Sequence, residues 1–309
     1  MRASHAINYI FQIKSIFFDQ QSVFCHDWAK ATDPRGSSRG TTVMADQFGI
    51  EDKGDHLVVF IDNPPQRNTL TPAYHAAQQD ALAMAEREQR IASVILAGRG
   101  GYFCAGGELS MLNRAVEGSR EERELLISAL QDSIRAIRNC PKPVIAAVNG
   151  GAAGAGLSTM LACDLIVADE GATFLAAHIR IGATVDGGLS WFLARSLPHA
   201  LAAELCLFGS VVDAETLFRH GVINKVVTKG TAEAAATELA GKLARGPVHS
   251  QSEQKKLLVA ARHNALSDHL DLEMDTLVEV LGSAGPKEGV AAFLEKRRPN
   301  FAAAEGRKG

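Results

Sequence analysis

The chain has 309 residues, 46% of them hydrophobic and 22% charged, so it is long enough to bury a substantial core. A formal net charge of −3 excludes the strongly basic field that is typical of nucleic-acid binding, and we predict no nucleic-acid partner. Five widely spaced cysteines without a C-x-x-C pair exclude a disulfide or zinc framework and favour a reducing, cytoplasmic location. No metal is predicted, since the ten histidines include no H-E-x-x-H or paired ligand spacing.

Residues 1–43 differ in character from the rest of the chain. Their apolar patches are broken by Lys14, which argues against a signal peptide, and Thr32–Thr42 is rich in glycine, serine and charge. No run of about 18 apolar residues predicts a membrane span. We interpret residues 1–43 as a disordered extension or as a misassigned upstream start before Met44.

From Met44 on, apolar strand-like runs alternate with helical patterns. The predicted strands are His56–Ile61, Ser93–Ala97, Pro143–Val148 and Asp164–Ala168, and the clearest helices between them are Pro72–Arg90 and Glu121–Arg138. Such alternation predicts an α/β fold with parallel strands and right-handed crossovers. Beyond Ser190 the pattern is mostly helical, apart from Val222–Val227. We therefore predict an α/β core over residues 44–200 and a helical region over residues 201–309.

Two glycine-rich turns come directly after predicted strands. The first is Gly98–Leu109, and the second, Gly150–Gly156, opens a helix that runs to Cys163. Amides at the start of a helix have no internal partners, so two such turns are able to converge on one oxygen atom. Neither turn matches the dinucleotide or P-loop fingerprint, so nucleotide binding by those mechanisms is disfavoured. Close packing without a ligand is the alternative explanation, and Cys104 in the first turn is interpreted as a small buried filler.

Several ordered motifs together resemble the enoyl-CoA hydratase/isomerase (crotonase) family. They are NPPQRNTL, FCAGGEL, IAAVNGGAAGAG, DGGLSWFLARSLP and EGVAAFLEKRRPNF, and the resemblance covers Gln47–Phe301. It implies a crotonase fold of repeated ββα units in a spiral, with C-terminal trimerisation helices, and a homotrimer or a dimer of trimers. An ordinary helical cap on a monomer is the alternative. The resemblance also implies an acyl-CoA thioester substrate and no separate cofactor, because CoA is part of the substrate.

The matching motifs imply an oxyanion hole for the thioester oxygen. They assign its two donors to the backbone amides of Ala105 and Ala155. Gly106, Gly107 and Gly154 are then expected to let the acyl group approach the backbone closely. Preorganised donors of this kind stabilise an enolate without any titrating group.

The acid/base group departs from the pattern of the hydratases. Where those enzymes carry two glutamates, this chain has Ser158 and His178. Asp186 stands where several relatives that are not simple hydratases carry a catalytic aspartate, so we predict Asp186 as the principal acid/base and His178 as a helper. The structural alternatives are that Asp186 caps the helix beginning near Gly188 and that His178 is a satisfied structural residue. Ser158 and His178 as a nucleophile and base would instead make a thioesterase.

The resemblance also implies contacts to CoA. Arg67 is expected near the pantetheine-phosphate arm, and Phe293 and Lys296 near the adenine and 3′-phosphate, donated across a subunit boundary. A solvated basic helix end is the alternative for Lys296. Ser158 and Trp191 are further candidate substrate contacts, with core packing the equal alternative for Trp191.

The missing glutamates favour isomerisation or hydrolytic opening over plain hydration. The motifs look most like the aromatic-catabolism branch of oxepin-CoA hydrolases and ring-epoxide isomerases. An ordinary enoyl-CoA hydratase and a non-catalytic CoA-binding scaffold remain open alternatives. The sequence does not identify the acyl group.

Overall fold

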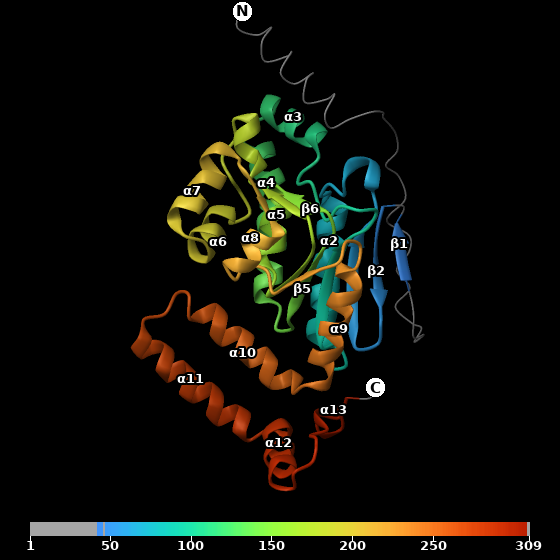
Figure 1. Ribbon diagram of the computed structural model, residues 1–309, viewed down its shortest axis with the longest axis vertical. Helices are drawn as coiled ribbons and strands as arrows, with labels where there is room; N and C mark the ends of the chain where they lie inside the picture. The colour runs from blue at the N-terminus through green and yellow to red at the C-terminus, as the bar shows by residue number, and fades with distance from the viewer. Residues whose placement is uncertain (1–41, 46, 308–309) are drawn as a thin grey trace, which may run out of the picture. The chain divides into compact units, whose positions relative to one another are not determined.

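A computed structural model describes residues 42–45 and 47–307, which belong to one compact unit, Arg39–Gly309 (Figure 1). Except for Thr42 and Val43, the predicted extension lies outside the described residues. No helix in the described part of the chain is long and apolar enough to cross a membrane.

A seven-stranded sheet forms the centre of this unit, with the order β1-β2-β3-β4-β5-β7-β10. Its strands are β1 (Thr42–Ala45), β2 (Phe48–Asp52), β3 (His56–Ile61), β4 (Ser93–Gly98), β5 (Val144–Val148), β7 (Leu165–Asp169) and β10 (Lys225–Val227). The pairs from β3 to β10 are parallel, as the alternation of strands and helices predicts, and β1 and β2 add an antiparallel edge. The predicted strands in this stretch are confirmed to within a residue or two, because each is a continuous apolar run that the sheet buries.

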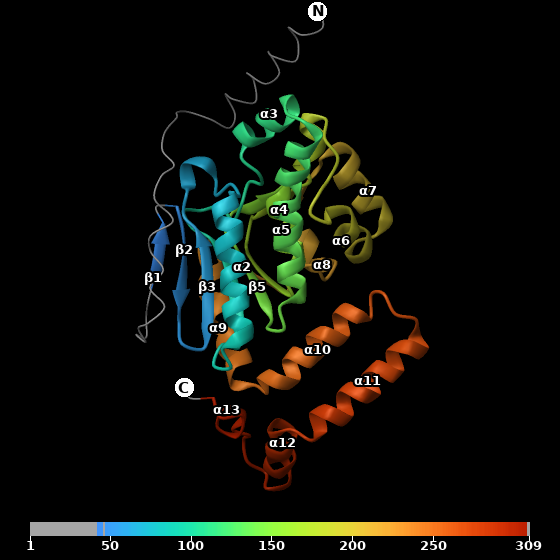
Figure 2. The ribbon, with the colours of Figure 1, turned by 180° about the vertical axis from the view of Figure 1, so that it is seen from behind.

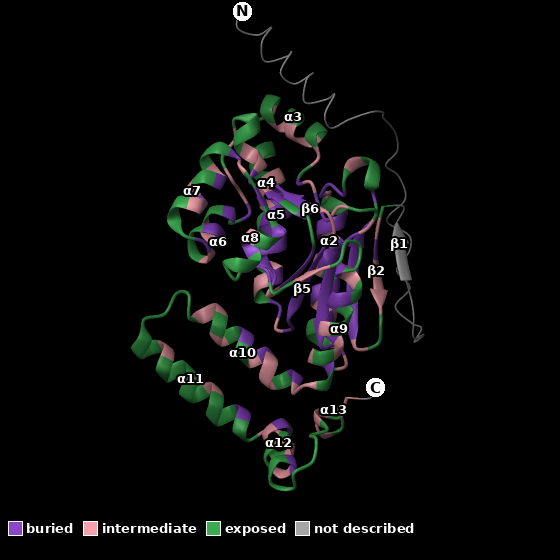
Figure 3. Cartoon of the chain, viewed as in Figure 1, coloured by how far each residue is buried: buried purple, intermediate pink, exposed green. Residues whose placement is uncertain are grey.

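The two faces of the sheet are covered by different helices (Figure 2). Alternate strand residues such as Val58, Ile95 and Ile145 pack with the alanines of α9 (Ala232–Arg245), while Leu57, Leu96 and others join the larger core on the opposite face. That core includes residues of α2 (Pro72–Arg87), α4 (Arg120–Asn139) and α5 (Ala155–Ala162). Figure 3 shows the central strands and α5 as the most deeply buried part of the described chain.

The two predicted helices are present with slightly different ends. The first ends at Arg87 rather than Arg90. The second begins at Arg120, because the side chain of Ser119 accepts the amide of Glu122 while the Glu122 carboxylate accepts the amide of Ser119. This reciprocal capping box satisfies amides that the first helical turn leaves without partners.

A small second sheet, β6-β8-β9, lies next to the two glycine-rich turns. Its strands are β6 (Gly151–Ala153), β8 (Thr173–Leu175) and β9 (Val211–Asp213). It leads directly into the elements that carry the candidate site, which are α5, the short 3-10 helix η2 (Ala177–Ile181) and α6 (Leu189–Ser196). The remaining described helices are η1 (Pro64–Gln66), α3 (Leu109–Glu117), α7 (His199–Phe208), α8 (Ala214–Arg219), α10 (Val248–Ala260), α11 (Leu266–Leu281), α12 (Ala284–Leu294) and α13 (Phe301–Ala304).

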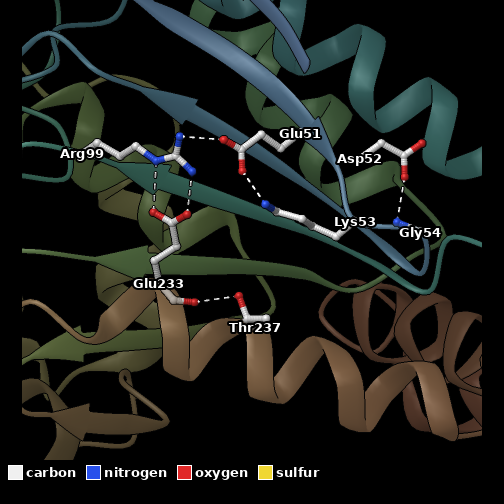
Figure 4. Close-up of polar contacts among 7 residues, drawn as sticks. All are labelled: Glu51, Asp52, Lys53, Gly54, Arg99, Glu233 and Thr237. Atoms are coloured by element: carbon white, nitrogen blue, oxygen red, sulfur yellow. Dashed lines mark hydrogen bonds and ion pairs between the residues drawn. The ribbon is translucent and has the colours of Figure 1, made fainter. Parts of the chain in front are cut away.

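Two charged contacts fasten distant parts of the fold. Arg99, just after β4, donates to Glu233 on α9 at 2.7 and 3.3 Å and to Glu51 on β2 at 2.9 Å (Figure 4). Lys255 on α10 is buried, and its Nζ lies 2.6 Å from Asp164 Oδ2 and donates to two backbone carbonyls. The contact of Lys255 fixes the start of the C-terminal helices to the sheet.

Candidate active site

The first glycine-rich turn is shaped by a buried asparagine from the NPPQRNTL motif. The Asn68 side chain donates to the carbonyls of Arg99, at 2.8 Å, and Tyr102, at 2.5 Å, and accepts the amide of Asn63 at 2.7 Å. Asn68 is fully buried, and its backbone φ of +58° is one that asparagine tolerates better than most residues. The motif therefore sets the path of the turn rather than supplying a reacting group.

The two turns meet at Gly106. A Cβ atom there would lie 3.0 Å from the carbonyl oxygen of Ala153 and 3.3 Å from the amide nitrogen of Ala155, and Gly106 has φ of +100°. Only glycine allows both this backbone conformation and this approach. Ala155 is the first residue of α5, so its amide has no partner inside the helix.

The prediction that Ala105 supplies the other donor is contradicted by its hydrogen bond. The Ala105 amide donates to the carbonyl of Arg67 at 2.9 Å and is thus consumed inside the protein. Across residues 47–307, the amide of Gly107 donates to no group, and a Cβ on Gly107 would meet nothing within 4 Å. Gly107, two residues further along, therefore offers an unpaired amide in the first turn.

His178 and Asp186 form a hydrogen-bonded pair beside the second turn. His178 Nε2 lies 3.0 Å from Asp186 Oδ1, and the two side chains are 12% and 23% exposed. An ideal Cβ on Gly154 would lie 3.9 Å from His178 Cε1 and 4.0 Å from the Cα of Gly106. The imidazole is thus adjacent to the place where the two turns meet.

Asp186 does not cap the helix that begins after it. The N-cap residue of α6 is Gly188, and no side chain makes a capping hydrogen bond there. Instead, the carboxylate of Asp186 faces His178, and its backbone carbonyl accepts the amide of Leu189 at 3.0 Å. The capping alternative is therefore wrong, and the carboxylate keeps lone pairs that no backbone amide occupies.

Ser158 contributes to the position of Asp186. It is fully buried on α5, and its hydroxyl donates to the backbone carbonyl of Asp186 at 3.0 Å. A Cβ on Gly187 would lie 2.8 Å from the Cβ of Ser158, so a glycine is needed for this close approach. In the described structure no hydrogen bond joins Ser158 to His178.

Burial controls the chemistry of Cys104 in the first turn. Desolvation raises the pKa of the Cys104 thiol to about 12, so the thiol stays protonated near neutral pH. The expectation of a small buried filler fits this environment better than a nucleophile does. Among the described residues, no group of three or more histidine, cysteine or carboxylate side chains is arranged to hold a metal ion.

The remaining predicted residues fall into two sets. Arg67 lies beside the first turn, with its Cζ 5.7 Å from the centroid of the Tyr102 ring. Trp191 packs against the hydrophobic core, and its ring stacks on His263 with the centroids 5.9 Å apart. Phe293 and Lys296 are exposed on and just after α12, without a described contact to the site.

The structure therefore brings together most of the predicted site. The residues gathered around the two turns are Arg67, Gly106, Gly107, Gly154, Ala155, Ser158, His178 and Asp186. Sequence reasoning missed Asn68 and the amide of Gly107. The sequence shows that Gly107 lies within the first turn, but it does not show the hydrogen bond from the Ala105 amide to the carbonyl of Arg67.

Comparison with known proteins identifies the family of the chain. The family model for enoyl-CoA hydratase/isomerase matches residues 53–304, which is more than half of the chain, so the chain belongs to the enoyl-CoA hydratase/isomerase family. It is 38% identical to a probable enoyl-CoA hydratase of Rhodobacter capsulatus, over 79% of this chain and 93% of that protein. It is 34% identical to the 1,2-epoxyphenylacetyl-CoA isomerase of Escherichia coli, over 79% and 94%.

Solved structures of relatives have the same crotonase fold. An enoyl-CoA hydratase from Polaromonas sp. JS666 has a TM-score of 0.79 and 42% identity, covering 82% of this chain and 98% of that one. An enoyl-CoA hydratase homologue from Streptomyces coelicolor has a TM-score of 0.80 and 31% identity, over 87% and 99%. The chain is therefore an enzyme of the hydratase/isomerase family with the α/β crotonase fold.

Proposed function

We propose that this enzyme acts on an acyl-CoA through a stabilised thioester enolate, with Asp186 as its proton carrier. The observation that carries the proposal is the hydrogen bond between His178 and Asp186, which pairs the carboxylate with an imidazole next to the junction of the two turns instead of with the start of α6. The net reaction we favour is isomerisation or hydrolytic opening of an acyl group.

In this proposal the thioester oxygen binds between the amides of Gly107 and Ala155. Each preorganised donor contributes about 3 kcal/mol of transition-state stabilisation. Ala155 begins α5, and the positive end of the helix dipole adds to the attraction for the developing oxyanion. Gly107 replaces Ala105 in this role because its amide has no partner in the described chain.

Asp186 then takes a proton from the acyl group and returns it at another carbon. In the tautomer with a proton on Nε2, His178 donates to Oδ1 and leaves Oδ2 for the substrate. Ser158 holds the backbone carbonyl of Asp186, so side-chain and main-chain contacts both orient the carboxylate. We assign His178 and Ser158 as positioning residues for Asp186.

Plain hydration is less well supported. The hydratase mechanism uses two carboxylates, and the side chains at those two places are Ser158 and His178, both of which contact Asp186. The relatives have the names of hydratases and of isomerases, so family membership does not decide between the two reactions. The relative from Escherichia coli, named for an epoxide of phenylacetyl-CoA, supports an aromatic or ring-derived acyl group.

The thioesterase alternative has little support. A nucleophilic serine needs a base that accepts its proton. The Ser158 hydroxyl instead donates to a backbone carbonyl, and the Nε2 of His178 is occupied by Asp186.

We further propose that the C-terminal helices assemble the enzyme as a homotrimer or a dimer of trimers. Helices α11 and α12 leave many large apolar side chains more than a third exposed, including Leu266, Leu270, Met274, Leu277, Val278, Leu281, Val290, Phe293 and Leu294. Exposed apolar side chains gathered on neighbouring helices are typical of a protein–protein interface. In the assembly, Phe293 and Lys296 would reach the CoA moiety bound by a neighbouring subunit, while Arg67 binds it from within the same chain.

The experiment that tests the proposed reaction is product analysis by mass spectrometry. The native enzyme is incubated in heavy water with enoyl-, hydroxyacyl- and aromatic ring-derived acyl-CoA thioesters. We expect isomerisation or ring opening with deuterium incorporation, lost in Asp186→Asn and kept in the matched control Asp80→Asn, an exposed aspartate on α2. Added water without any isomerisation would favour ordinary hydration.

Two other outcomes distinguish the remaining alternatives. Release of free CoA that disappears in Ser158→Ala would support the thioesterase. Binding of CoA without turnover of any thioester would contradict the proposed function and support a scaffold. Light scattering on the same protein tests assembly, since a trimer has three times the 32.9 kDa mass of one chain.

A further inference from the structure

A second cavity lies at the opposite end of α5, between the core and α10. It has a volume of about 280 Å³, and its polar lining includes Arg138, Asp164, Ser196, Asn224, Lys255 and Arg262. Cys163, which follows the eight residues of α5, lines the cavity. At 1.5 Å per helical residue, this lining is roughly 12 Å from the Ala155 amide. The cavity is thus distinct from the junction of the two turns.

The one carboxylate in this lining is already saturated. Asp164 Oδ2 accepts the amide of Val144 at 2.8 Å and lies 2.6 Å from Lys255 Nζ. Its Oδ1 lies 3.5 Å from Arg138 Nη1. Because Lys255 already balances the charge of Asp164 at the shorter distance, the charge of Arg138 is not fully compensated.

Arg262 adds a cation with no carboxylate to match it. No ion pair involves Arg262 in the described residues, and its Cζ lies 5.3 Å from the centroid of the Trp191 ring. Arg262 is exposed, and partial desolvation together with the neighbouring charges of Arg138 and Arg195 lowers its pKa from the usual value. Cations that repel one another in this way leave a local excess of positive charge.

Neutral donors complete the lining. Asn224 uses its side-chain oxygen to accept the amide of Ile166 at 2.7 Å, so its NH₂ group remains available. The hydroxyl of Ser196 has no hydrogen-bond partner in the part of the chain that the structure describes. The cavity therefore offers donors and positive charge, while its only carboxylate is occupied.

We infer that this cavity binds a small oxyanion, with the phosphate group of a small metabolite or inorganic phosphate as its ligand. Phosphate accepts hydrogen bonds from guanidinium groups in a fixed geometry and supplies the negative charge that Arg138 and Arg262 lack. The volume is at the lower end of ligand sites, which suits a ligand much smaller than an acyl-CoA. This inference does not depend on the reaction proposed for Asp186.

Trp191 provides a local reporter of binding. The chain has two tryptophans, and Trp28 lies outside the described residues, so Trp28→Phe leaves Trp191 as the only indole. Inorganic phosphate is titrated into this variant at constant ionic strength while its fluorescence is recorded. We expect a saturable change, because a bound anion alters the field of Arg262 over the indole ring.

Arg262→Gln tests the site directly. We expect at least a tenfold weaker affinity for phosphate, because a charged hydrogen bond and an uncompensated charge are lost. Arg262→Lys keeps the charge but lacks the planar pair of donors, so its affinity for phosphate should lie between those of the parent and Arg262→Gln. The matched control is Arg87→Gln, an exposed arginine at the end of α2, which should bind phosphate as the parent does.

Two results would overturn the inference. One is the absence of a saturable phosphate response from Trp191. The other is an equal response in Arg262→Gln, which would place the anion elsewhere, for example at a CoA phosphate subsite. Repeating the titration with succinate separates the oxyanions, and tighter binding of phosphate than of succinate is expected.

Discussion

The two ends of α5 use one carboxylate each in opposite ways. At its N-terminal end, the carboxylate of Asp186 pairs with His178, and no backbone amide in the described part of the chain donates to it. At its C-terminal end, Asp164 is surrounded by Lys255, Arg138 and a backbone amide. The first carboxylate is left available for chemistry, and the second is consumed in holding α10 to the sheet.

Both residues are aspartates, so the difference in their roles comes from the groups that each carboxylate contacts. A carboxylate with a single side-chain partner is able to exchange a proton with a ligand. A carboxylate matched by a buried cation contributes to stability, and the excess cations around it become the part that a ligand would meet. Substitutions at both ends of α5 test this difference, and the largest effect is expected at the N-terminal end.

Ala155→Pro removes the amide donor at the N-terminal end of α5. Proline lacks an N–H, and the first position of a helix accepts proline without loss of the fold. We expect kcat to fall by about 10²- to 10³-fold, as for the loss of one oxyanion donor. Steady-state kinetics on a thioester that the native enzyme converts measures this, with Ala155→Ser, which keeps the amide, as the control. Unchanged kcat in the proline variant would remove Ala155 from the oxyanion hole.

His178→Phe removes the contact that orients Asp186. Loss of a hydrogen bond to a charged group predicts a fall in kcat of roughly 10- to 100-fold with little change in KM. His178→Gln, whose amide is able to donate to the carboxylate, should recover part of the rate. Equal rates for the native enzyme, His178→Phe and His178→Gln would show that His178 has only a structural role. A melting curve of each variant shows whether a lower rate comes from a loss of thermal stability.

These positions mark how far the sequence alone reaches. The strands at His56–Ile61 and Ser93–Gly98 were predictable because a buried apolar run is a local signal. The hydrogen bond of the Ala105 amide was not predictable, because its acceptor is the carbonyl of Arg67, which is distant in the sequence. Amide donors can be proposed from a motif, but which of them is free depends on tertiary contacts.

Two side chains near α6 show the same limit. Asp186 at two residues before Gly188 fits a helix cap equally well by spacing, and only the position of His178 separates the two roles. Trp191 was a candidate substrate contact with core packing as the equal alternative, and it packs against the core and stacks on His263 just after α10, 72 residues away by numbering. The orientation of a helix on its neighbours decides which face meets the substrate, and periodicity does not report it.

Lys255→Met tests the C-terminal end of α5. Removal of one partner of a buried ion pair leaves Asp164 poorly compensated and costs about 3–5 kcal/mol of unfolding free energy. The melting temperature should fall by roughly 6–15 °C. Lys256→Met is the matched control, because Lys256 is an exposed neighbour on the same helix that pairs with Glu253 at the surface. Equal melting temperatures for both variants would contradict the role assigned to Lys255.

The smallest effect is expected on stability at low pH, through the hydrogen bond between Arg99 and Glu51 in Figure 4. The hydrogen bond from Arg99 lowers the pKa of Glu51 from 4.5 to about 2. Because the folded-state pKa is depressed, the stabilisation is fully present above pH 4.5 and is lost as the pH falls from 4.5 to 2. Glu51→Gln should lower neutral-pH stability by about 1–3 kcal/mol and flatten this part of the curve.

Denaturant unfolding at several pH values measures that change. Glu124→Gln serves as the control, since Glu124 is an exposed glutamate in a surface pair on α4. If Glu51→Gln retained the same acid-induced loss as the native protein, the contact with Arg99 would not be its source.

The most direct test of the central claim uses a saturated acyl-CoA, which can be neither hydrated nor isomerised. Exchange of its α-protons for deuterium, monitored by NMR in heavy water, reports enolate formation alone. We predict enzyme-dependent exchange that Asp186→Asn reduces by about 10²- to 10⁴-fold and that Asp80→Asn leaves unchanged. Exchange at the native rate in Asp186→Asn would contradict the claim that Asp186 carries the proton.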